Sequence, residues 1–116
     1  MKLFITLLFL TSLAYAGSDK TYKVKNLSVI ISFQDGIIAN RDCFQDQVKC
    51  QAIKMAKKFA SVQPSKNVEG KNPNSMKCKD ILHGEVVIGT DDEGNENSFC
   101  VFPDHSMISC SSINKF

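Results

Sequence analysis

The alternation of apolar and polar positions predicts a β-hairpin near the start of the chain. Between residues 27 and 34 apolar side chains recur at every second position, a period typical of a half-buried strand. Asp35-Gly36 follows, and Asp-Gly between two apolar stretches predicts a tight turn into a short second strand at 37–39. Residues 17–25 are mostly polar, and we expect them to be loose at their start.

Residues 42–62 carry the strongest periodic signal in the chain and predict one long helix. Their apolar side chains are three or four residues apart, which places them within about 80° of one another on a helix: Phe44, Val48, Ala52, Met55, Phe59 and Val62. Asp42, with Gln45 three residues later, is a weak capping-box pattern for the helix start. Pro64 ends the predicted helix.

The second half of the chain predicts a short helix and three strands. A polar loop at 65–74 leads to a helix at 75–82, closed by Gly84. Strands follow at 85–90, 98–102 and 106–113, separated by an acidic turn and a tight turn. The expected fold class is therefore α+β: a small disulfide-stabilised domain in which one long helix and one short helix pack on an antiparallel sheet. Residues 17–66 and 67–116 are expected to form one globular unit.

The N-terminus has the features of a signal peptide. Lys2 precedes a short apolar stretch, and Ala14-Tyr15-Ala16 is a small-x-small cleavage site, so residues 1–16 are predicted to be removed. We therefore expect a secreted or periplasmic protein. The five cysteines all follow the cleavage site, and an oxidising compartment favours disulfides between them: Cys43, Cys50, Cys78, Cys100 and Cys110. An odd number leaves one thiol free or bonded to another chain.

Charge is distributed unevenly along the chain. Residues 17–79 contain 12 Lys/Arg and 5 Asp/Glu, whereas residues 80–116 contain 1 Lys and 7 Asp/Glu. One interpretation is that the two halves attract each other within one fold. The other is a basic face that binds anionic cell-surface polymers.

A motif in the C-terminal half resembles a known family. The chain reads Asn72-Pro73-Asn74-Ser75, then Cys78, then His83-Gly84, and finally Cys100-Val101-Phe102-Pro103-Asp104-His105-Ser106. This order resembles small exported bacterial domains of unknown function that carry a haemolysin label, and it covers about residues 71–110. The chain departs from the pattern in four ways: His83 and His105 stand where the family has Gly, the last Cys lies four residues after Ser106 and not two, and there is no Trp. The label itself implies little mechanism, and no pore-forming segment is visible.

The motif residues also have structural roles that follow from their chemistry. Asn72 is suited to cap a helix whose first residue is Pro73. Pro103 fixes φ in the turn, and Asp104 can bond to its own backbone. The motif set is thus expected to be architectural: Asn72, Pro73, Ser75, Gly84, Phe102, Pro103, Asp104 and Ser106.

The disulfide pattern is predicted only in part. Cys78 and Cys100 both lie in the motif, and a bond between them would clamp the short helix to the sheet. If Cys43 and Cys50 lie in one helix, their Cα atoms are about 10 Å apart and cannot be bridged. Cys110 is then expected to pair with one of them. If the helix begins near Asp46 instead, Cys43 can fold back onto Cys50 and leave Cys110 free.

The sequence favours a protein without catalytic, cofactor or metal sites. His83 and His105 are expected in surface turns, and the acidic turn after residue 90 lacks the order of a calcium loop. We expect an exported non-enzymatic module of the cell envelope, whose partner is an envelope or extracellular protein or an anionic surface polymer, with no role in nucleic-acid binding. The alternative is a secreted protease inhibitor that presents the turn Pro103–Ser106.

Overall fold

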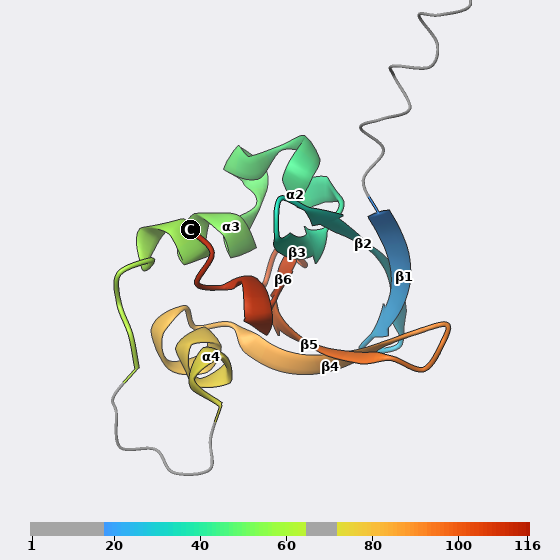
Figure 1. Cartoon of the computed structure of the whole chain (residues 1–116). Helices are drawn as coiled ribbons and strands as arrows, with labels where there is room; N and C mark the ends of the chain where they lie inside the picture. Colours follow the sequence, from blue (N-terminus) through green and yellow to red (C-terminus); the bar gives the residue numbers. More distant parts are fainter. Residues whose placement is uncertain (1–17, 65–71) are drawn as a thin grey trace, which may run out of the picture.

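The computed structural model describes residues 18–64 and 72–116. Within them the chain forms a closed barrel of six antiparallel strands, with short helices packed against one side (Figure 1). The predicted signal peptide, its cleavage site and most of the predicted loop 65–74 lie outside the described residues. No helix of the described part is long and apolar enough to cross a membrane.

Three strands come from each half of the chain. Their order around the barrel is β1-β2-β3-β6-β5-β4, so the two halves meet at two seams. The strands are β1 Ser18–Val24, β2 Leu27–Gln34, β3 Ile37–Asn40, β4 Glu85–Asp91, β5 Glu96–Val101 and β6 Met107–Ser109.

The predicted turn at Asp35-Gly36 is confirmed, because Gln34 pairs with Ile37 and both turn residues have positive φ, 52° and 79°. The segment before β2, expected to be loose at its start, is strand β1 from Ser18 onward and pairs with β2 along its whole length. Polar side chains on its outer face obscure the strand pattern, since only Tyr22 and Val24 point into the barrel and are buried.

The single long helix predicted for residues 42–62 is wrong. The segment consists of α2 Asp42–Gln45, the 3₁₀ turn η2 Gln47–Lys49 and α3 Gln51–Lys58. Asp46 and Cys50 have extended backbone conformations, and each interrupts the helical hydrogen bonding. The apolar period therefore continues through a bent segment, and Val48 is 78% exposed instead of facing a core. The α+β expectation of a long helix on a sheet is replaced by a barrel with short helices.

The short helix in the motif is present, and it begins two residues before the predicted residue 75, at the Asn72-Pro73 start that the motif suggested. Asn72 accepts hydrogen bonds from the N–H groups of Asn74 and Ser75, and Pro73 is the first residue of α4 Pro73–Met76. The helix continues as a π-helical turn, η3 Lys77–Ile81. The last predicted strand is shorter than expected, because the chain after β6 turns into the 3₁₀ helix η4 Cys110–Ser112.

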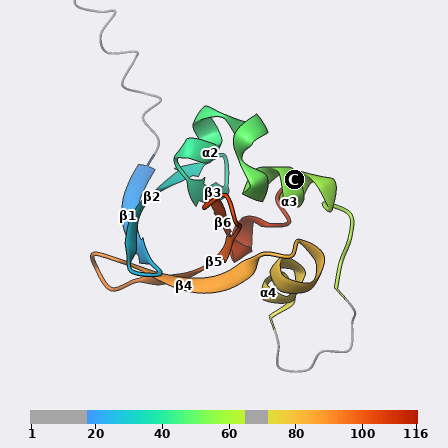
Figure 2. The same cartoon turned by 180° about the vertical axis from the view of Figure 1, so that it is seen from behind.

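Two apolar cores lie on the two sides of the barrel wall. One fills the interior and contains Tyr22 and Phe99, whose rings meet edge to face with centroids 5.3 Å apart. The other lies between the wall and the helices and contains the cysteines together with Ile53, Leu82 and Ile108. Figure 2 shows from behind that α3 and α4 lie on the side of the barrel away from β1.

Few residues are paired between strands across the two seams of the barrel. β3 and β6 share one pair, Ala39–Ile108, but side chains strengthen this seam: Asn40 Oδ1 accepts from Met107 N and Ser112 Oγ accepts from Ile38 N, each at 2.9 Å. β1 and β4 share two pairs, at residues 22–23 and 90–91, and the ion pair Lys25–Glu85 bridges the opening beyond them.

Candidate functional site

The disulfides fix the elements around the motif. Cys78 of η3 is bonded to Cys100 of β5, as the sequence predicts. The expected bond of Cys110 to the long-helix segment is wrong, because Cys43 is bonded to Cys50 and Cys110 is free and buried. The interruptions at Asp46 and Cys50 bring the Cα atoms of Cys43 and Cys50 to 5.1 Å. The pairing of the alternative left open by the sequence is thus observed, although α3 begins at Gln51 and not near Asp46.

Gly84 is required by the disulfide beside it. A Cβ atom at this position would lie 2.5 Å from Cys100 Sγ and 3.2 Å from Cys78 Sγ. It would also lie 3.2 Å from Phe102 Cζ. The motif glycine therefore lets the backbone approach the cross-link closely. After the short helix, His83 has left-handed backbone with φ 59°, and the N–H of Gly84 donates to Cys78 O at 2.8 Å.

The motif turn caps helix α3 across the fold. Asp104 Oδ2 accepts from Gln51 N, and Ser106 Oγ accepts from Ala52 N, both at 2.9 Å. The next N–H group, of Ile53, points to Cys50 Sγ at 3.5 Å. Three N–H groups that an isolated helix would leave unpaired at its first turn are thus satisfied. The sequence suggested local roles for Asp104 and Ser106 but gave no signal of this long-range contact.

The carboxylate of Asp104 is held in its ionised form. Desolvation raises the pKa of this group, but hydrogen bonds from the side chain of Ser106 and from the N–H groups of Gln51 and Ser106 lower it, and the net result lies below the usual range. Asp91, the last residue of β4, is similar. Burial raises its pKa, but bonds from Asn95 and Glu93 and the charge of Lys20 hold it below the ordinary value.

Both histidines occupy left-handed backbone conformations. His105 has φ 69° and lies in a turn closed by its own N–H to Phe102 O and by Phe102 N to Ser106 O. This conformation is sterically unfavourable for L-residues, whereas glycine adopts it freely. His83 and His105, which stand where the motif pattern has Gly, therefore have the backbone geometry that favours glycine.

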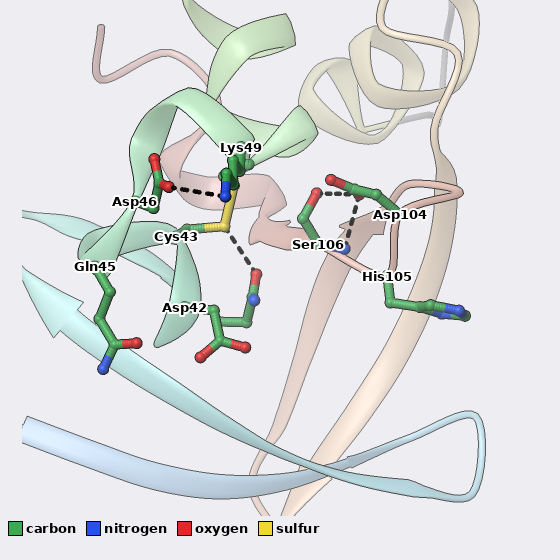
Figure 3. A pocket seen from close by; sticks show the side chains of 10 residues that line it. Asp42, Cys43, Gln45, Asp46, Lys49, Asp104, His105 and Ser106 are labelled. Carbon is green, nitrogen blue, oxygen red and sulfur yellow. Dashed lines mark hydrogen bonds and ion pairs between the residues drawn. A yellow bond between two sulfur atoms is a disulfide. The ribbon is translucent and has the colours of Figure 1, made fainter.

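A polar groove lies between the α2–η2 segment and this turn (Figure 3). It encloses about 310 Å³. Figure 3 shows Asp104 and Ser106 bonded to each other while His105 projects away from them, and it shows Lys49 paired with Asp46. The lining residues are Asn40, Asp42, Cys43, Gln45, Asp46, Lys49, Cys50, Asp104, His105 and Ser106.

His105 also borders two further hollows. One, of about 310 Å³, lies beside Arg41 and the outer face of β2. The other, of about 470 Å³, lies at the mouth of the barrel beside Leu27 and Phe102, and His83 lines it as well. The fold thus brings both histidines to one hollow, although 21 residues separate them in the sequence. Their exposed positions in turns agree with the sequence prediction.

The polar groups that line the groove differ in how far they are already engaged within the fold. Its two sulfur atoms are oxidised in the Cys43–Cys50 bond, so neither is a nucleophile. Asp104 and Ser106 are engaged with α3. In the described ranges, no three His, Cys, Asp or Glu side chains are placed to hold a metal ion. Asp42, Gln45 and His105 remain exposed, and each can hydrogen-bond to a ligand.

The free thiol lies apart from the groove. Cys110 is 4% exposed, and burial raises the pKa of its thiol, although a hydrogen bond with Ser75 opposes that shift. A buried thiol with a raised pKa is poorly reactive. This placement does not favour the bond to another chain that the odd number of cysteines suggested.

Comparisons with known proteins leave the family open. The chain matches no protein-family model, no curated protein and no solved structure.

Proposed function

We propose that the protein is an exported, non-enzymatic module of the cell envelope, related to the exported domains with a haemolysin label, and that it binds a partner protein in the groove around His105. The observation that carries this proposal is the position of His105. A side chain larger than glycine is held in a left-handed turn, at the border of three hollows. Strained residues of this kind concentrate at functional sites.

The motif residues support a binding role over a catalytic one. Gly84, Asp104 and Ser106 maintain the disulfide and the start of α3, which makes the turn rigid. A rigid turn loses little entropy when a partner binds. We therefore expect the purified protein to show no hydrolase activity and no lysis of red cells.

The inhibitor alternative is less well supported by the same turn. Residues 102–106 are folded onto themselves by two backbone hydrogen bonds, and the side chain of Asp104 is directed to α3. Many peptides bind a protein surface in an extended conformation, as an added strand. A panel of proteases tests this alternative, and tight inhibition that is lost in His105→Gly would favour it over the envelope module.

Site-specific photo-crosslinking in the native host tests the proposed groove. A photoreactive residue at Gln45, which is exposed in the groove, is expected to capture a discrete envelope protein. The same residue at Thr21, exposed on β1, is the matched control and is expected to capture none.

The second arm uses the purified protein and the captured partner. His105→Gly keeps the backbone conformation and removes the imidazole, so we expect it to fold at least as well as the native chain and to bind at least tenfold more weakly. Equal capture from Gln45 and Thr21, or full affinity in His105→Gly, would exclude the groove as the binding site.

A further inference from the structure

Within residues 18–64 and 72–116, the ion pairs that join the basic half to the acidic half lie on one side of the barrel. Two ion pairs join the halves, Lys20 of β1 with Asp91 and Lys25 of the β1–β2 turn with Glu85. A third ion pair, Lys49–Asp46, is local. These are the ion pairs that the described residues form, and none of them reaches α3. Among the described residues, no ion pair therefore offsets the positive charge of that helix.

Helix α3 presents a row of lysines to solvent. Lys54, Lys57 and Lys58 are all exposed, and their spacings of three and four residues place them on one face. The helix has no acidic residue, so like charges adjoin there without a carboxylate between them. Such spacing is unfavourable for an isolated helix.

Further positive charge lies at the end of this helix. Lys57 Nζ is 6.0 Å from the centroid of the Phe116 ring, and Lys115 is the exposed neighbour of Phe116. The ammonium of the buried Lys77 bonds to Ala60 O, just beyond the helix. We call the three α3 lysines together with Lys115 the α3 lysine face.

We propose that the α3 lysine face binds a linear polymer that carries repeated phosphate groups. Lysine ammonium groups bind phosphate as point charges, and a row of them matches a chain of regularly spaced anions. The proposal is independent of the groove around His105, because neither Lys54, Lys57, Lys58 nor Lys115 lines that groove.

The same face is poorly suited to insertion into a bilayer. An interfacial membrane helix offers an apolar side to the lipid. The apolar side of α3, formed by Ala52, Ile53 and Ala56, is buried against the barrel wall. Phe59 and Phe116 are half-buried and lie near the ammonium groups of Lys58 and Lys57. Only charge is thus available for binding at this face.

Binding of long-chain inorganic polyphosphate to the purified protein tests the proposal. When four cations are engaged, a plot of the logarithm of the affinity against the logarithm of the salt concentration has a slope of about −3, because each phosphate contact contributes roughly 0.7. Affinity should therefore drop about 50-fold between roughly 50 and 200 mM salt. Each Lys→Gln substitution on the face should reduce the slope by about 0.7.

The decisive variants are Lys54→Gln/Lys57→Gln/Lys58→Gln and the control Lys23→Gln. Lys23 is exposed on β1 and takes no part in the three ion pairs of the described residues. We expect the triple variant to lose binding and to melt at nearly the native temperature, while the control binds with only a small loss. An equal loss per charge in both variants would overturn the proposal and indicate binding by net charge. Binding to vesicles of anionic lipid without binding to polyphosphate would also overturn it.

Discussion

The carboxylate of Asp104 accepts a hydrogen bond from the backbone N–H of Gln51 at 2.9 Å, across 53 positions of the sequence. This contact joins the motif turn to the first residue of α3, and therefore joins the part of the chain that carries the motif to the part that lies outside it. Ser106 repeats the arrangement at Ala52. The motif thus acts as the cap of a helix that belongs to the other half of the chain.

Removal of this cap should destabilise the fold. Asp104→Ala and Ser106→Ala are each expected to lower the free energy of unfolding by about 1 kcal/mol, the usual effect of losing an N-terminal helix cap. Urea unfolding followed by circular dichroism measures the loss. Asp42→Ala, in the same groove, is the control and should change stability by less than about 0.5 kcal/mol.

The same contact predicts a dependence on pH. The pKa of Asp104 is lower in the folded protein than its ordinary value, so its contribution is fully present above about pH 4 and is lost as pH falls through the folded pKa. The difference in stability between the native chain and Asp104→Asn should therefore shrink between pH 5 and pH 2. A difference that stays constant over this range would show that the carboxylate does not cap α3.

Gly84→Ala should destabilise the fold more than the addition of one methyl group suggests. The added Cβ would meet the sulfur atoms of Cys100 and Cys78, both held in a bond, and we expect a loss of about 1 to 3 kcal/mol from overpacking. Gly36→Ala is the informative comparison, because a Cβ there meets nothing within 4 Å and only the positive φ opposes it. Thermal melting of the two variants separates the steric effect from the backbone effect.

The two disulfides should contribute unequally. Cys78 and Cys100 are 22 residues apart and Cys43 and Cys50 are 7 apart. On the chain-entropy account, these loops correspond to about 3 and about 2 kcal/mol. Paired Cys→Ala variants and denaturant unfolding measure both values. Peptide mapping without reductant should recover these two bonds, and iodoacetamide should label Cys110 only after unfolding. Rapid labelling of native Cys110 would contradict its burial.

The free energy of unfolding should increase as pH rises toward 10, because Lys77 is buried. Burial lowers the pKa of its ammonium in the folded state, so the unfolded chain binds more protons between the folded pKa and about 10.4. Lys77→Met removes the titrating group, so the variant should lack that part of the increase. Lys79→Met is the matched control, since Lys79 is exposed. If both variants show the same pH profile as the native chain, Lys77 is not desolvated in solution.

Local chemistry was enough to predict several elements correctly. Asp35-Gly36 adopts positive φ more readily than other residue pairs, and Asn72-Pro73 satisfies a helix start by itself, so both features were visible in the sequence. The Cys78–Cys100 bond followed from the motif. In contrast, the hairpin turn at Lys25-Asn26, where both residues have positive φ, was not predicted from the sequence.

Tertiary contacts decided the rest. The apolar period of residues 42–62 is compatible with one helix, but the extended residues Asp46 and Cys50, the Cys43–Cys50 bond and the caps from Asp104 and Ser106 favour a helix that starts at Gln51. Local periodicity reports which side chains are apolar and not which partners pair with the backbone. Closure of the barrel depends on strands from opposite halves of the chain, and no short-range signal specifies that pairing. The sequence by itself therefore determined turns, caps and one cross-link, while the tertiary structure determined the barrel, the groove around His105 and the exposure of the α3 lysines.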